Sequence, residues 1–267
     1  MNEALYSHIK SLPPLPESAT KIQAICADPH SGVADLAKVI ETDPMLTANL
    51  LKAANSPLYG FSREIKTLAQ AVSLFGMATV RGFALAGAVK STLKIDMSPY
   101  GMDAERFVDL AQLQNALMIR WYGQVNRAML DILSPAAFLT NVGRVILARE
   151  IVGQGKTAEF ANFGKEHGYE AAEEKYLDAT YQEVSAAVFT QWRFEQEIVD
   201  SIAYSLEPEH ATEPNMRRCA QALKVVQATV TTPAGITAES IESAGELVTT
   251  YGMNAESFSK AASALIK

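Results

Sequence analysis

The stretch DPMLTANLLKAANSPLYG at residues 43–60 contains one complete helix together with its start and stop signals. Asp43 is a residue type that caps helix N-termini, and Pro44 follows at the first helical position, where its missing N–H removes no hydrogen bond. The apolar positions that then recur at helical spacing are Leu46, Leu50, Ala53 and Ala54. Asn55-Ser56-Pro57 ends the pattern. The segment therefore predicts a helix over 43–54, followed by a loop around Tyr59-Gly60.

The same helical periodicity continues on both sides of this segment. Residues 67–93 predict two closely packed helices with a break at Gly76, and Asp103 and Ser134-Pro135 each mark the start of another helix. Further helices are expected at 156–167, 169–177, 181–191 and 194–206, and three more in 213–267. The sequence contains no convincing alternating strand or hairpin signal, so it predicts an all-α fold.

The composition is that of an ordinary globular protein. The 267 residues are 48% apolar and 20% charged, with a formal charge of −7, which excludes a disordered chain. No part of the chain offers the dense basic patch that nucleic-acid binding needs. The apolar stretch Thr67–Val89 is too polar, and too short before Arg81, for a membrane span of ~20 residues. The first ten residues lack the regions of a signal peptide, so we expect a cytoplasmic protein.

Residue chemistry alone predicts no active site. The four histidines are His8, His30, His167 and His210, and neither His30 nor His167 has a second histidine or a carboxylate at a spacing typical of a metal site. No serine lies in a G-x-S-x-G turn, and two cysteines, Cys26 and Cys219, cannot form a disulfide framework. The acidic run Glu170, Glu173 and Glu174 is interpreted as a solvated helix face. Catalysis must therefore be judged on other grounds.

A series of motifs resembles the HDOD family, which comprises bacterial signalling-associated domains related to HD-type metal-dependent phosphohydrolases. The motifs, in order, are Leu12-Pro13-Pro14-Leu15-Pro16, Asp43-Pro44-Met45-Leu46, Ala54-Asn55-Ser56-Pro57-Leu58-Tyr59-Gly60 and Ala71-Val72-Ser73-Leu74-Phe75-Gly76. The resemblance covers residues 12–210 and implies a multi-helix, HD-like orthogonal bundle. It implies an N-terminal helical subdomain over 12–98 and a degenerate HD-like subdomain over 99–210. Residues 211–267 are expected to supply C-terminal helices that complete the fold.

The HD metal ligands that the resemblance implies are replaced in this chain. In the matching run Leu139-Thr140-Asn141-Val142-Gly143-Arg144, Thr140 stands for the histidine and Asn141 for the aspartate. The other ligand positions fall on Leu110, Tyr181 and Gln227. A hydroxyl and amides lack the imidazole donor and negative charge that such a site uses. We therefore expect no metal, no cofactor and no catalysis; the alternative is a phosphohydrolase of nucleotides or phosphodiesters with a displaced metal site.

The resemblance then implies a regulatory module that acts by binding signalling proteins. The loop residues Asn55, Ser56, Tyr59 and Gly60 are candidates for an interaction surface, although they could instead close a helix end. The vestigial HD pocket could bind a nucleotide-type ligand through Arg144, because a guanidinium binds phosphate in a bidentate manner. The alternative for Arg144 is an ion pair with a nearby acidic side chain.

Overall fold

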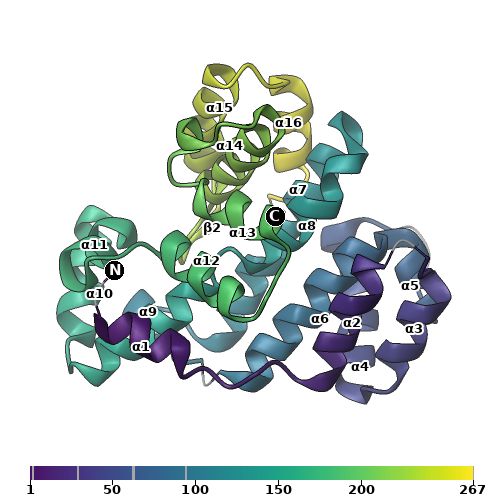
Figure 1. The fold of residues 1–267 in the computed structure, drawn as a ribbon. Helices are drawn as coiled ribbons and strands as arrows, with labels where there is room; N and C mark the ends of the chain where they lie inside the picture. Colours follow the sequence, from purple (N-terminus) through teal and green to yellow (C-terminus); the bar gives the residue numbers. More distant parts are fainter. Residues whose placement is uncertain (2, 29, 62–63, 94, 267) are drawn as a thin grey trace.

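The structure, a computed structural model, describes residues 1, 3–28, 30–61, 64–93 and 95–266. Helices make up nearly all of its regular structure, so the predicted all-α class is confirmed. In Figure 1 an N-terminal group of helices lies on one side, a second group lies opposite, and the C-terminal helices stand above the long central helices. The chain from α1 (Glu3–Lys10) crosses between the two groups to reach α2 (Glu17–Ala27).

The N-terminal group contains the helix from which the sequence analysis began. Its further members are α3 (Val33–Glu41), α4 (Pro44–Ala54), the 3-10 turn η1 (Pro57–Tyr59), α5 (Leu68–Phe75) and α6 (Met77–Thr92). The carboxylate of Asp43 accepts a hydrogen bond from the N–H of Leu46 at 3.0 Å, so the predicted cap is confirmed. The predicted break at Gly76 is also confirmed, and α5 and the first part of α6 are bent by 114° there.

The central helices contain one start that the sequence analysis placed wrongly. After η2 (Ser98–Tyr100) come α7 (Ala104–Val125), η3 (Arg127–Met129) and α8 (Leu130–Leu139), and α8 packs against both α6 and α7. Ser134-Pro135 was expected to start a helix, yet Pro135 lies inside α8. A proline lacks the N–H that would bond to the carbonyl four residues earlier, at Asp131. Arg81 Nη2 donates to that carbonyl at 3.2 Å, which satisfies it.

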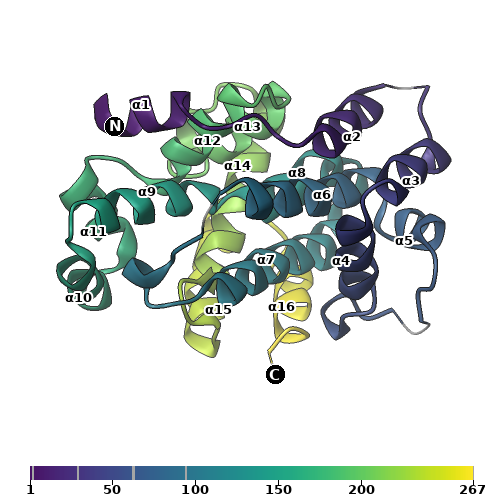
Figure 2. The same cartoon turned by 90° about the horizontal axis from the view of Figure 1, so that it is seen from below.

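The second group and the C-terminal helices follow the expected order closely. The second group consists of α9 (Val142–Gly153), α10 (Thr157–His167), α11 (Tyr169–Leu177), α12 (Tyr181–Gln191), α13 (Gln196–Ala203) and the turn η4 (Pro208–His210). The chain then forms α14 (Pro214–Thr229), α15 (Ala238–Thr250) and α16 (Ala255–Ser263). α14 packs on α8 and α13, and α16 packs on α7 (Figure 2). The C-terminal helices therefore share the core of the central ones.

A short hairpin between α14 and α15 was missed by the sequence analysis. Its strands are β1 (Val230–Thr231) and β2 (Gly235–Ile236), which pair antiparallel with Val230 opposite Ile236. The Thr232-Pro233 peptide bond in the connecting turn is cis. Strands of two residues are too short to show alternation, so only the helix break at this position was predictable.

Within the part of the chain that the structure describes, one helical stretch is apolar enough by length and composition alone to cross a membrane, as is the bent pair α5–α6. The stretch runs from Arg127 to Gly153, and 83% of its most apolar window is buried inside the protein. Its apolar side chains therefore pack against other helices in the manner of a core helix.

Candidate functional site

The break between α8 and α9 carries the segment that resembles the HD motif. Thr140 follows α8 directly, and Asn141 precedes the first residue of α9. Their exposed fractions are 0% and 4%, and that of Arg144, in the first turn of α9, is 6%. The three polar side chains are thus held in the interior, where each needs a hydrogen-bonding partner.

Amide side chains from two other helices satisfy this pair. Asn141 Nδ2 donates to Oε1 of Gln114 on α7 at 2.9 Å, and Gln227 Nε2 on α14 donates to Thr140 Oγ1 at 2.7 Å. Gln227 Nε2 also donates to the hydroxyl of Ser205 at 3.0 Å. The structure thus brings Thr140, Asn141 and Gln227 together.

The helix α7 contributes Gln114 to this group of polar side chains. Leu110, which the resemblance favoured, lies one helical turn earlier and is 2% exposed. Its Cδ2 lies 3.7 Å from the position that a Cβ on Gly235 would take, so Leu110 packs beside the hairpin. Gln114 was not singled out from the sequence, although its amide, four residues after Leu110 on the same face of the helix, was a signal of a polar group there.

Arg144 is the cation of this group, and its Nε and Nη1 donors face inward, whereas its Nη2 lies 3.6 Å from Oε1 of the exposed Glu170. Its Nε donates to Glu173 Oε1 at 2.9 Å, and its Nη1 donates to Asn141 Oδ1 at 3.2 Å and to Thr232 Oγ1 at 2.7 Å. Its guanidinium carbon lies 3.8 Å from the centre of the Tyr181 ring, within the range of a cation–π contact. Tyr181 thus joins the group through its ring.

Glu173 corrects the interpretation of the acidic run on α11. Glu170 and Glu174 are exposed as expected, but Glu173 is 0% exposed. Its Oε1 also accepts from the Tyr100 hydroxyl at 3.1 Å, and its Oε2 accepts from the N–H of Tyr181 at 3.0 Å. Its position among exposed acids hid this role, because the partner Arg144 lies 29 residues away.

Electrostatics in this group follow from burial. Burial raises the pKa of Glu173, and the Arg144 guanidinium and the N–H of Tyr181 act against that rise. Burial acts to lower the pKa of Arg144, but its neighbours Glu173, Tyr181, Tyr100 and Glu170 together outweigh this effect and raise that pKa, so the guanidinium stays protonated. Burial likewise raises the pKa of Tyr181. We call Gln114, Thr140, Asn141, Arg144, Glu173, Tyr181 and Gln227 the polar centre.

The polar centre does not fit a divalent metal of the HD type. Its hydroxyl and amide oxygens carry no charge, and the oxygens of Gln114 and Asn141 already accept hydrogen bonds. The single carboxylate, Glu173, is paired with Arg144, whose positive charge would repel a metal cation. Among the residues that the structure describes, no three or more His, Cys, Asp or Glu side chains are grouped to hold a metal ion. No hydrolytic step can be derived from such donors.

The histidines lie away from the polar centre. His8 on α1 contacts Glu150 at 3.0 Å, His167 ends α10, and His210 ends η4. His30 is exposed near the start of α3. The hydrogen bonds given above for the polar centre involve none of them.

The loop that follows α4 holds its neighbourhood together. Asn55 Nδ2 donates to the carbonyls of Leu51 and Ile65, both at 2.9 Å, and its Oδ1 accepts from the N–H of Ile65 at 2.8 Å. The hydroxyl of Tyr59 donates to Asn115 Oδ1 at 3.1 Å. Gly60 has φ +66°, which favours glycine. Asn55, Tyr59 and Gly60 therefore close the end of α4, whereas the Ser56 hydroxyl accepts a long bond of 3.4 Å from the Leu58 N–H.

The same loop borders a groove between α4 and α7, with a volume of about 710 Å³, which we call the α4–α7 groove. Its apolar lining includes Leu46, Leu58, Phe83, Ala86, Leu113, Phe138 and Ile236. Lys52 lies on the α4 side, and Glu105 and Asp109 lie on the α7 side. All three charged residues are exposed.

Comparisons with known proteins identify the family. The HDOD domain matches residues 12–208, so this chain belongs to the HDOD family. This confirms the family resemblance seen in the sequence. A search of curated proteins finds no match.

Similar solved structures cover nearly the whole chain. A virulence factor from Campylobacter jejuni is 25% identical, with a TM-score of 0.59, over 98% of this chain and 97% of that one. A Shewanella amazonensis protein provisionally named a phosphohydrolase is 19% identical, with a TM-score of 0.70, over 98% and 94%. A Marinobacter aquaeolei protein provisionally named a signal transduction protein is 21% identical, with a TM-score of 0.63, over 96% and 60%. The last two, at these identities, show the fold alone.

Proposed function

We propose that this HDOD chain is a non-catalytic regulatory module that acts by binding a signalling protein. The observation that carries the proposal is the Arg144–Glu173 pair at the place that resembles the HD motif. The groups that would serve chemistry in an HD enzyme here bond to one another and to neighbouring side chains. Function must then be exerted at the surface. The name of the Marinobacter aquaeolei structure is consistent with a signalling role.

The α4–α7 groove is the surface that best suits a protein partner. It combines an apolar floor with a charged rim, which is the usual anatomy of a protein interface. Lys52 lies on the α4 wall and the exposed Glu105 and Asp109 lie on the α7 wall, where the Arg106 guanidinium is held by the carbonyls of Pro233 and Ala234. The groove therefore favours a partner segment with one basic and one acidic edge. An amphipathic helix laid into the groove meets both conditions.

Charge reversal on the groove wall tests the partner proposal. Proteins crosslinked to the wild-type chain in its native host are compared with those crosslinked to Asp109→Arg. A matched control is Lys165→Glu on α10, an exposed residue far from the groove. We expect a specific partner to be recovered with the control in the same amount as with the wild type. With Asp109→Arg its recovery should fall about tenfold, as expected when a charge contact is lost. Equal recovery by both variants would remove the groove from the proposal.

Metal analysis tests the non-catalytic part. Protein purified without a metal-affinity tag is assayed for Mn, Fe, Ni and Zn, and for hydrolysis of nucleotides and phosphodiesters. We expect substoichiometric metal and no turnover that a chelator abolishes. Stoichiometric metal with chelator-sensitive turnover would establish the alternative, a phosphohydrolase with a displaced metal site.

A nucleotide-type ligand at the polar centre would act by competing with Glu173 for Arg144. The guanidinium uses its Nε and Nη1 donors in hydrogen bonds, and its Nη2 lies 3.6 Å from Glu170 Oε1, so a phosphate would compete with these acidic partners for the cation. A thermal-shift screen of nucleotides tests this regulation, because a ligand that binds only the folded state raises its stability. Stabilisation by a nucleotide that Arg144→Lys removes would support it, and an unchanged Tm throughout the screen would contradict it.

A further inference from the structure

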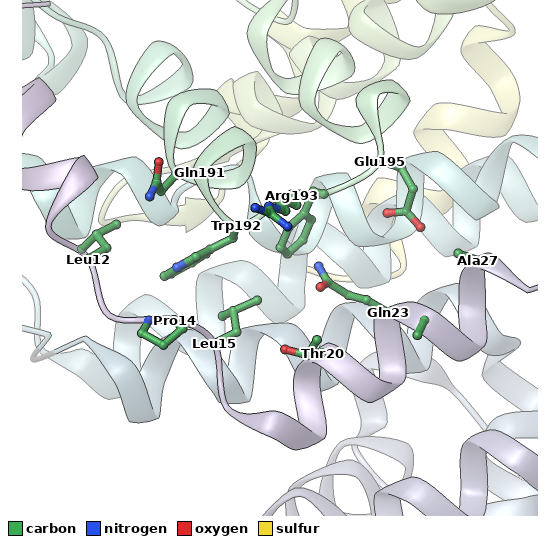
Figure 3. A pocket seen from close by; sticks show the side chains of 12 residues that line it. Leu12, Pro14, Leu15, Thr20, Gln23, Ala27, Gln191, Trp192, Arg193 and Glu195 are labelled. Carbon is green, nitrogen blue, oxygen red and sulfur yellow. The ribbon is translucent and has the colours of Figure 1, made fainter.

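A second pocket lies on the opposite side of α6 from the groove, between α2 and the turn joining α12 to α13. Its volume is about 680 Å³. Figure 3 shows α2 with Thr20 and Gln23 along one wall and the turn residues Trp192 and Arg193 along the other. The segment that carries Pro14 and Leu15 closes one end. We call this the α2–α12 pocket.

The backbone at Arg193 is unusual for its residue type. Its φ is +57°, in the left-handed region, and the N–H of Phe194 bonds back to the carbonyl of Phe189 at 3.0 Å. This is the helix-ending turn in which glycine normally occupies the left-handed position, because a side chain is strained there. The described residues with positive φ are seven glycines, Asp178 and Arg193. The need to end α12 therefore does not explain an arginine at this position.

The side chain of Arg193 is free to bind. It is exposed, and within the described ranges its guanidinium has no ion pair or hydrogen-bond partner. Figure 3 shows it at the centre of the pocket, with Gln23 reaching toward it from α2. The Nε2 of Gln23 is buried and has no hydrogen-bond partner among the described residues. Two sets of unused donors thus converge on one space.

The remaining surroundings define the rest of the ligand. Glu195, the acidic residue at the edge, is paired with Arg81, so its negative charge is compensated. Leu15 and Trp192 offer apolar surface beside the donors, and Trp192 Nε1 is already used by the carbonyl of Pro13 at 3.1 Å. Unused donors, one uncompensated cation and an apolar wall suit an anion with an apolar body.

We propose that the α2–α12 pocket binds a small organic anion whose carboxylate or phosphate is held by Arg193 and Gln23. The apolar part of this ligand packs on Leu15 and Trp192. The site is separate from the polar centre, and its occupancy does not depend on the proposed partner. Because the pocket walls come from the N-terminal helix α2 and from the α12–α13 turn, a bound anion would tie these two parts of the chain together.

Calorimetric titration of the full chain tests the proposal with three probes of similar shape. Benzoate and phenyl phosphate carry the two anionic groups, and phenol is the uncharged control. We expect saturable binding of at least one anion and none of phenol, and the preferred anion identifies the group recognised. Absence of binding by both anions, or equal binding of phenol, would overturn the proposal.

A glycine substitution separates binding from folding. Arg193→Gly removes the guanidinium while relieving the left-handed backbone, so its Tm should equal or exceed that of the wild type. We expect its affinity for the anion to fall about tenfold or more. The matched control is Asp178→Gly, at the other non-glycine residue of positive φ, which should bind as the wild type does. Unchanged affinity in Arg193→Gly would refute the assignment.

Discussion

Arg144 and Glu173 form an ion pair across the interior, with Nε and Oε1 2.9 Å apart and side-chain exposures of 7% and 0%. A buried pair of this kind adds little stability compared with apolar residues, but its separation is costly. The pair joins α9 to α11 and supports the packing of the Tyr181 ring.

Removing one member of the pair should destabilise the protein strongly. Arg144→Met leaves Glu173 buried without its counter-charge, at a cost of about 3–5 kcal/mol in the free energy of unfolding. Glu173→Gln in the Arg144→Met background should restore part of that loss, because the second substitution removes the isolated charge. Urea unfolding of the two single variants and the double variant measures the coupling. Strictly additive losses would show that the two side chains do not interact as described.

Gly143 should tolerate no side chain. A Cβ there would lie 2.7 Å from the N of Ser185 on α12, because α9 and α12 approach closely at this point. Gly143→Ala should therefore cost about 1–3 kcal/mol or more by forcing the helices apart. Gly153→Ala is the matched control on the same helix, with nothing within 4 Å of its Cβ. It should stabilise by about 0.5–1 kcal/mol, and similar Tm values for both variants would contradict the close approach.

Substitution of Asn55 should destabilise the protein, whereas substitution of Ser56 should leave its stability nearly unchanged. Asn55→Ala removes one donated and one accepted bond that tie the end of α4 to Ile65, and a further bond donated to the Leu51 carbonyl, at a cost of about 1–3 kcal/mol. Ser56→Ala loses one bond of 3.4 Å and should change stability by less than about 0.5 kcal/mol. Thermal unfolding compares the two. Equal losses of stability in the two variants would indicate that Asn55 has no special structural role and that the loop is available as an interaction segment.

The two cysteines should react slowly at pH 8. Burial raises the pKa of Cys26 and that of Cys219 from 9.0 to about 11, so their thiolate fraction at this pH is about 100-fold lower than in the unfolded chain. Because the folded state holds these protons more tightly, the associated stability is fully present below pH 9 and is lost as the pH rises toward 11. Thiol labelling over this range, with guanidinium-unfolded protein as the control, measures both effects. Equal labelling rates for the folded and the unfolded protein at pH 8 would contradict the burial of the two thiols.

The fold was predictable wherever local signals decided it. Asp43-Pro44 and Gly76 act on their own helices, and the structure places the cap and the break where the sequence put them. Ser134-Pro135 misled because Arg81, more than fifty residues earlier, supplies the donor that lets a proline lie inside α8. No local pattern contains that information.

The candidate site was predictable only in part, for a similar reason. Thr140 and Asn141 could be assigned from the motif around them, whereas Gln114 and Glu173 belong to the polar centre through partners on other helices. A glutamate among exposed acids and a glutamine on an apolar stripe differ from their neighbours only once the chain has folded. The groove and the α2–α12 pocket likewise arise from elements far apart in the sequence.

The hairpin β1–β2 contacts both the polar centre and the α4–α7 groove. Thr232, in its turn, accepts the bond from Arg144 Nη1, while Gly235 and Ile236 line the α4–α7 groove. Arg106 fixes the turn from α7 by donating to the carbonyls of Pro233 and Ala234. The conformation of this hairpin thus couples the polar centre to the groove. Anything that shifts this hairpin in the groove must change the free energy of the Arg144 contacts, and by reciprocity the reverse holds.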